Sequence, residues 1–167
     1  MGVYLNPGND KFYKAINSEI YVDKTGLIQY TNRVFNTMQQ NVCVSRPRRF
    51  GKSMTANMLA AYYSRGCQSE KLFEEFKITK DPSFRQHLNR YNVFFMNMQE
   101  FLSGSKTVEK MIFRISQLLM RDLKQEYPDI AYFDETDLAE SMQDVYQHTG
   151  CPFVIIIDEW DCNFPGI

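Results

Sequence analysis

The feature that most constrains the fold of this chain is the segment of residues 45–53, which reads Ser-Arg-Pro-Arg-Arg-Phe-Gly-Lys-Ser. An apolar run, residues 41–44, precedes it, and residues 54–63 follow with the spacing of an amphipathic helix. A strand, a loop ending in Gly-Lys-Ser and a helix form the setting of a phosphate-binding loop, in which backbone N–H groups and a helix N-terminus attract an anion. The segment therefore predicts a nucleotide-binding loop.

The loop residues supply the expected contacts to a nucleotide. The Lys52 ammonium would reach the β- and γ-phosphates, and the Ser53 hydroxyl would ligate Mg²⁺. Arg46 stands where the usual pattern has its first glycine, so the loop taken alone also allows a chance Gly-Lys-Ser at a helix start. The residues predicted to bind the nucleotide are Arg46, Pro47, Arg48, Arg49, Phe50, Gly51, Lys52, Ser53 and Met54.

A second motif lies at the end of the apolar run of residues 153–157, which Asp158 and Glu159 follow directly. An apolar strand that ends in two acids has the pattern of a Walker B segment. We expect Asp158 to hold Mg²⁺, usually through water, and Glu159 to orient and deprotonate the attacking water. Glu159 and Lys52 are the predicted catalytic residues, and Ser53 and Asp158 are the predicted metal ligands. The alternative is that the acids only end a buried strand with soluble side chains.

Short apolar runs alternate with helical patterns along the chain. The predicted core strands are residues 41–45, 91–98 and 153–157, and the predicted helices are residues 54–63, 106–126 and 135–148. Strands that alternate with helices imply βαβ units and a parallel sheet. Because ligands bind at the carboxyl ends of parallel strands, and both motifs follow such ends, we expect the two motifs to form one site.

Composition and charge narrow the class of protein. The chain has 167 residues, 44% of them apolar and 23% charged, which suits one domain with a sizeable core. Its formal net charge of -1 gives no global field that would attract nucleic acid or a membrane. The apolar run near residue 155 is too short to span a bilayer, and the N-terminus lacks the regions of a signal peptide. The four cysteines show no Cys-x-x-Cys spacing, so we expect reduced, packed thiols in a cytoplasmic protein.

Three stretches carry a family resemblance: residues 21–25 (Tyr-Val-Asp-Lys-Thr), residues 46–53 and residues 154–161. In these stretches the chain resembles the AAA-ATPase-like domain family of bacterial P-loop NTPases, in which the arginine-rich form of the loop is expected. The resemblance implies a three-layer α/β P-loop fold of the ASCE type, ATP and Mg²⁺ as cofactors, and a catalytic Glu beside the Walker B Asp. It also implies that residues 21–24 lie on the nucleotide side, near the base.

The resemblance sets the expected domain organisation. Residues 1–40 would lead into the core, and residues 41–167 would form the P-loop NTPase core up to and including Walker B. Such proteins usually continue with further core strands, a sensor residue, a helical lid and often a PD-(D/E)XK nuclease-like domain, so we expect this sequence to be the N-terminal portion of the fold. Nucleic acid would be a partner through that nuclease domain, and an oligomer is compatible with the family.

Three functions remain open from the sequence. The leading hypothesis is Mg²⁺-dependent ATP binding and hydrolysis; ATP is favoured over GTP because no Asn-Lys-x-Asp guanine signature is present. The second is a nucleotide-sensing or interaction module that does not hydrolyse. The third is a nucleic-acid-binding domain that uses Arg46, Arg48 and Arg49, although this loop has no aromatic platform beside it.

Overall fold

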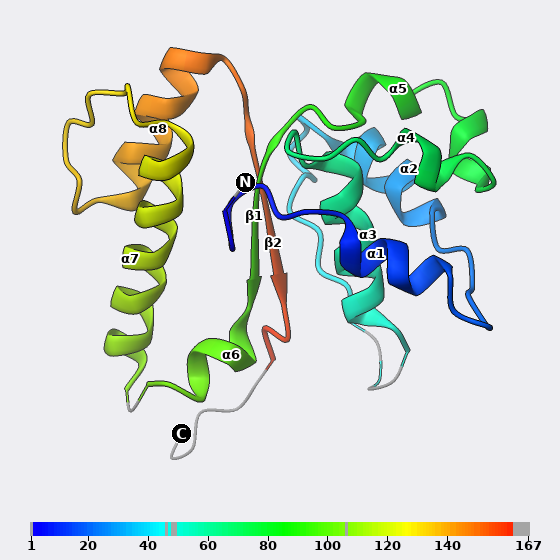
Figure 1. Cartoon of the computed structure of the whole chain (residues 1–167), viewed down its shortest axis with the longest axis horizontal. Helices are drawn as coiled ribbons and strands as arrows, with labels where there is room; N and C mark the ends of the chain where they lie inside the picture. The colour runs from blue at the N-terminus through cyan, green and yellow to red at the C-terminus, as the bar shows by residue number, and fades with distance from the viewer. Residues whose placement is uncertain (1, 46, 48–49, 106, 162–167) are drawn as a thin grey trace.

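The computed structural model describes the whole chain except residues 1, 46, 48–49, 106 and 162–167. It is a mixed α/β structure in which a small parallel sheet lies between two groups of helices (Figure 1). The strands are β1 (Asn92–Asn97) and β2 (Phe153–Asp158). The helices are α1 (Asp10–Ile16), α2 (Gly26–Val34), α3 (Lys52–Tyr63), α4 (Glu70–Phe73), the 3-10 helix η1 (Lys77–Lys80), α5 (Phe84–His87), α6 (Met98–Leu102), α7 (Val108–Glu126) and α8 (Leu138–Thr149).

The two strands run parallel, with Asn92 opposite Phe153 and Asn97 opposite Asp158. Their carboxyl ends therefore lie at the same edge of the sheet. The apolar residues of β1 are consecutive because both faces of the strand are covered. Val93 packs into the core on one face and Phe94 into the core on the other, and both are buried.

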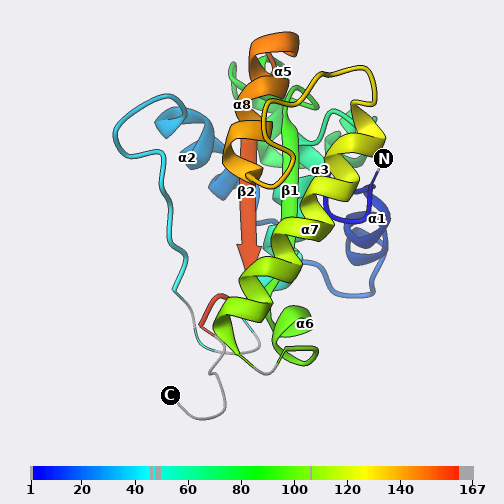
Figure 2. The ribbon, with the colours of Figure 1, turned by 90° about the vertical axis from the view of Figure 1, so that its left-hand side faces the viewer.

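Each face of the sheet has its own hydrophobic core. On one face, α1 to α5 pack through Phe12, Ile28, Met58, Tyr62 and Phe73. On the other, α6 to α8 pack through Phe101, Met111, Leu119, Leu123 and Val145. Figures 1 and 2 show the sheet between these two layers of helices. The layered arrangement is the one expected of a parallel α/β fold.

The N-terminal residues cover the outer edge of β1. Leu5 forms an antiparallel bridge with Phe94, and the Phe95 N–H donates to the Tyr4 carbonyl over 2.9 Å. The carboxylate of Asp122, on α7, accepts the Tyr4 N–H over 2.6 Å. Asp122 is buried and also pairs with Arg121 over 2.9 Å. The N-terminal residues thus connect the edge of β1 to α7 by hydrogen bonds.

Two of the three predicted strands are confirmed, at 91–98 and 153–157, and so are the predicted helices at 54–63, 106–126 and 135–148, with bounds shifted by a few residues. The predicted core strand at 41–45 is wrong. These residues are exposed and form no strand, and Figure 2 shows them in an extended segment set apart from β2. A parallel strand needs a hydrogen-bonded neighbour and cover on both faces, and residues 41–45 have neither in the described part of the chain. Cys43, expected to be packed, is accordingly exposed.

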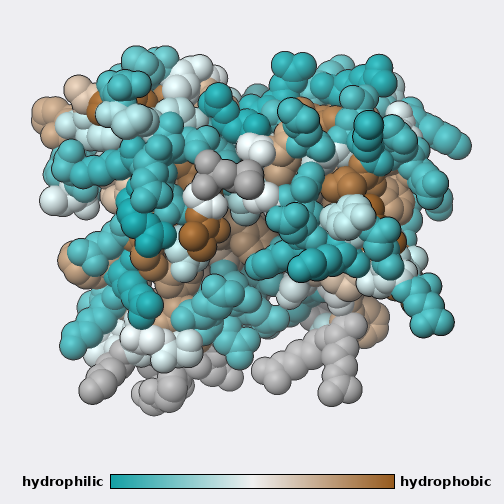
Figure 3. Space-filling model, viewed as in Figure 1, coloured by the Kyte–Doolittle hydropathy of each residue, from teal (hydrophilic) through white to brown (hydrophobic). Residues whose placement is uncertain are grey.

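Hydrophilic side chains cover most of the face shown in Figure 3, with apolar side chains in patches between them. Among the described residues, no helix combines the length and the apolar character needed to cross a membrane.

Candidate functional site

The Gly-Lys-Ser motif lies at the start of α3. Gly51 is the N-cap and adopts the left-handed conformation, with φ of 73°, and no side chain caps the helix. Its carbonyl accepts the Thr55 N–H over 3.0 Å and the Thr55 hydroxyl over 2.9 Å. The N–H groups of Lys52, Ser53 and Met54, in the first turn, therefore have no partner within the helix. This is the arrangement that binds an anion at a helix N-terminus.

The acidic motif lies at the end of β2. Asp158 is the last residue of the strand and is only 6% exposed. Glu159 follows with φ of 52°, in the left-handed region, and its N–H donates to the Asp158 carboxylate over 3.0 Å. A left-handed conformation costs a glutamate free energy, because its Cβ approaches the backbone, and such strain is concentrated at functional sites.

An ion pair joins the two motifs. The Lys52 ammonium lies 3.6 Å from the carboxylate of Asp161, three residues beyond the end of β2. The Lys52 side chain is 19% exposed, so neighbouring groups cover most of it. The start of α3 and the turn after β2 therefore lie close together at Lys52 and Asp161. The sequence did not identify Asp161 as the partner, since ion pairing between distant residues leaves no local pattern.

A second lysine reaches the same loop. The Lys24 ammonium donates to the Phe50 carbonyl over 2.5 Å, directly before Gly51. Lys24 belongs to residues 21–24, which the family resemblance is expected to place on the nucleotide side. Thr25 occupies the N-cap of α2 without a capping hydrogen bond from its side chain.

The neighbouring carboxylate fixes the turn that carries Lys24. Asp23 accepts the Thr25 N–H over 2.8 Å and the Thr25 hydroxyl over 2.7 Å. Its second oxygen accepts the Lys77 N–H over 3.3 Å. Burial acts to raise the pKa of Asp23, but the hydrogen bonds from Thr25 and Lys77 outweigh it and hold that pKa below its usual range. Asp23 is therefore ionised at neutral pH.

Comparison with known families identifies the chain. A family model named AAA-ATPase-like, described as predicted AAA-ATPase, matches residues 8–164. The chain belongs to this family. No curated protein and no solved structure matches it. Membership in the AAA-ATPase-like family indicates nucleotide binding, in agreement with the meeting of the two motifs at Lys52 and Asp161.

The remaining loop residues of this AAA-ATPase-like chain differ in exposure. Pro47 is exposed, Phe50 is 63% exposed and Met54 is 37% exposed, so these side chains are open to a ligand. The predicted contacts of Arg46, Arg48 and Arg49 lie outside the described residues. The role of these three arginines in nucleotide binding therefore stays a prediction from the sequence.

The predicted metal ligands of the AAA-ATPase-like chain are hard oxygen donors. Ser53 offers a hydroxyl in the first turn of α3, and Asp158 a carboxylate at the strand end. The described residues hold no group of three His, Cys, Asp or Glu side chains that could bind a metal. This donor set still suits Mg²⁺, which keeps several waters and is held by one or two protein oxygens together with substrate phosphates.

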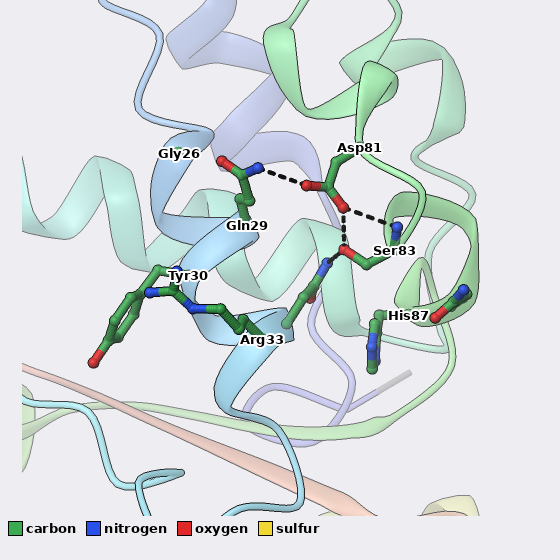
Figure 4. Close-up of a pocket in the computed structure, with 9 residues that line it drawn as sticks. Gly26, Gln29, Tyr30, Arg33, Asp81, Ser83 and His87 are labelled. Carbon is green, nitrogen blue, oxygen red and sulfur yellow. Dashed lines mark hydrogen bonds between the residues drawn. The ribbon is translucent and has the colours of Figure 1, made fainter.

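A separate polar groove of about 520 Å³ lies between α2 and the η1–α5 segment (Figure 4). The Asp81 carboxylate accepts hydrogen bonds from the Ser83 hydroxyl, over 2.6 Å, and from Gln29, over 2.7 Å. The hydrogen bonds from Ser83, followed by that from Gln29, hold the pKa of Asp81 below its usual range. None of the described residues predicted to bind nucleotide or metal lines this groove. The candidate site of the AAA-ATPase-like chain is thus the open surface between the loop and the strand end.

Proposed function

We propose that this chain binds ATP with Mg²⁺ at the loop of residues 46–54 and hydrolyses the bond between the β- and γ-phosphates. The observation that carries the proposal is the ion pair between Lys52 and Asp161, because it brings the loop lysine to the acidic end of β2. Membership in the AAA-ATPase-like family supports nucleotide use. In this proposal residues 41–167 belong to a P-loop core, and residues 1–40 lead into it.

Phosphate binding is assigned to Lys52 and the first turn of α3. The ion pair between Lys52 and Asp161 is partly open to solvent, since the Asp161 side chain is 53% exposed, so it is weak. A polyphosphate carries more negative charge than one carboxylate, and Lys52 would therefore exchange Asp161 for phosphate oxygens. The N–H groups of Ser53 and Met54 would bind further phosphate oxygens, helped by the helix dipole.

Hydrolysis is assigned to the acids at the end of β2. The Glu159 carboxylate would accept the proton of the water that attacks the γ-phosphate. Bound Mg²⁺, held by the Ser53 hydroxyl and by Asp158, would neutralise charge on the phosphates. The hydrogen bond from the backbone N–H of Glu159 orients the Asp158 carboxylate, which would face the metal, while the Glu159 carboxylate would face the water.

The test uses the single tryptophan of the chain. Trp160 lies between Glu159 and Asp161 and is 57% exposed, so its fluorescence should respond when ATP enters the site. Lys52→Ala should weaken ATP binding by at least about tenfold, because a charge-assisted hydrogen bond contributes about 1.5–3 kcal/mol. Glu159→Gln should bind ATP like the wild type and release no phosphate.

The matched control is Glu75→Gln, which removes the charge of an exposed carboxylate that makes no hydrogen bond or ion pair to the described residues. This variant should bind and hydrolyse ATP like the wild type. Tight ATP binding by Lys52→Ala would contradict the proposed site. ATP binding by the wild type without phosphate release would instead support the non-hydrolysing module.

A further inference from the structure

The stretch of residues 21–25 has no role in the mechanism above, although it is among the motifs that mark the family resemblance. We propose that Lys24 is a positioning residue that holds the phosphate loop in its binding conformation, through the Phe50 carbonyl and the left-handed Gly51. The proposal deepens the proposed function, on which its effect on ATP rests. Four observations carry it.

The first observation is that the stretch is anchored on both sides of Lys24. Tyr21 packs against Phe76 and Phe12, with ring centroids 5.4 Å and 6.2 Å apart. Thr25 is fully buried. The Asp23 carboxylate accepts hydrogen bonds from the Thr25 N–H and hydroxyl and from the Lys77 N–H of η1. The Lys24 backbone is therefore held by the same core that supports α3. Because the Lys24 backbone is fixed, its side chain can hold the loop in one position.

The second observation is the contact itself. The Lys24 ammonium donates to the Phe50 carbonyl over 2.5 Å, across 26 positions of sequence. A hydrogen bond from a charged donor is stronger than one between neutral groups. Phe50 itself is 63% exposed and so is not held in place by burial of its side chain. Among the described residues, the Lys24 contact is thus the tertiary hydrogen bond that holds Phe50.

The third observation concerns Gly51. A Cβ added to Gly51 would lie 2.6 Å from the Lys24 ammonium, so the ammonium occupies the space beside the Gly51 Cα that any side chain would need. With φ of 73°, Gly51 also has a conformation that glycine adopts without strain. Lys24 and Gly51 therefore fit each other, and the pair explains why glycine precedes Lys52.

The fourth observation is the direction of the peptide group. The C=O and N–H of a trans peptide point in opposite directions. Holding the Phe50 carbonyl toward Lys24 therefore turns the Gly51 N–H the other way and keeps the carbonyl oxygen from turning toward a bound phosphate. The Lys24 ammonium also adds one positive charge next to the loop. Both effects favour a polyphosphate over an uncharged ligand.

The experiment compares Lys24→Met, which removes the ammonium but keeps the chain length, with Lys24→Arg, which keeps the charge and the donors. Lys71→Met is the control, since Lys71 is an exposed lysine on α4 without a hydrogen bond or ion pair to the described residues. Two readouts are needed: hydrogen exchange of the amides of residues 50–55 without nucleotide, and ATP titration with steady-state hydrolysis.

We expect Lys24→Met to speed hydrogen exchange at residues 50–55 while the amides of β1 and β2 keep their protection. It should also weaken ATP binding about tenfold and raise KM more than it lowers kcat, whereas Lys24→Arg should restore most of both. Wild-type exchange at residues 50–55 in Lys24→Met would overturn the proposal. If the wild type itself bound no ATP, the proposed function would fail, and the exchange comparison would still decide whether Lys24 positions the loop.

Discussion

At the scale of single residues, each of the two motifs contains a left-handed backbone position. Gly51 has φ of 73° and Glu159 has φ of 52°. Glycine adopts this conformation freely, whereas glutamate pays for it. The cost at Glu159, which directly follows the buried Asp158, is compatible with a role at the site.

Gly51→Ala should impair the site without unfolding the protein. The new Cβ would impose about 1–2 kcal/mol of left-handed strain and would displace the Lys24 ammonium. We expect about a tenfold loss of ATP affinity by Trp160 fluorescence, with little change in the far-ultraviolet circular dichroism. Gly26→Ala is the matched control, since nothing lies within 4 Å of a Cβ added there. Equal ATP affinity in the two variants would contradict the prediction.

Motif chemistry explains which site residues the sequence could identify. Lys52 and Asp158 follow from local patterns, because a loop before a helix and acids after an apolar strand are each visible in a few residues. Asp161 and the ammonium of Lys24 act through tertiary contacts with Lys52 and Phe50. Those contacts join segments far apart in sequence, so no spacing rule points to them.

At the scale of elements, helical periodicity predicted the long helices α3, α7 and α8, and short apolar runs predicted β1 and β2. The segment 41–45 shows the limit of this signal. Val42 and Val44 make it apolar enough for a strand, yet they are 37% and 38% exposed. Apolar character shows that a segment can pair but not which strand it pairs with. The antiparallel cover of β1 by Leu5 was missed for the same reason.

Asp122→Ala tests how firmly that N-terminal cover is held. The change would leave the Tyr4 N–H without its carboxylate partner and Arg121 without its ion pair. We expect a loss of about 2–4 kcal/mol in the free energy of unfolding, measured by urea denaturation, because a buried charged acceptor is removed. The exposed Asp129 on the loop after α7 provides a control, and Asp129→Ala should stay within about 0.5 kcal/mol of the wild type. A similarly small change in Asp122→Ala would show that the N-terminal segment is held by other contacts.

At the scale of the whole molecule, the two cores share one thin sheet. Val93 and Ile156 belong to one core and Phe94 to the other. A substitution that disrupts the packing of either core should therefore also destabilise β1 and β2. His87 joins the first core from the end of α5, where its ring stacks on Tyr91 and hydrogen-bonds the Tyr91 hydroxyl over 2.6 Å. Burial lowers the pKa of His87 below its ordinary value.

This pKa shift predicts how the stability of the whole protein depends on pH. The folded state favours neutral His87, whereas the unfolded chain protonates at the ordinary value of about 6.5. As pH falls below that value, the unfolded state binds more protons, so the free energy of unfolding should decrease. His87→Gln should reduce this slope between about pH 5 and 6.5, measured by urea denaturation at several pH values. An unchanged slope in His87→Gln would refute the assignment.

The outer edge of β2 has a practical consequence for handling the protein. Among the described residues no segment pairs with this edge, and Ile155 and Ile157 are 53% and 48% exposed. An uncovered strand rich in β-branched residues is a template for another extended chain. The exposed edge of β2 is therefore the place in the described sheet where a second extended chain could add by edge-to-edge pairing, the more so as protein concentration rises.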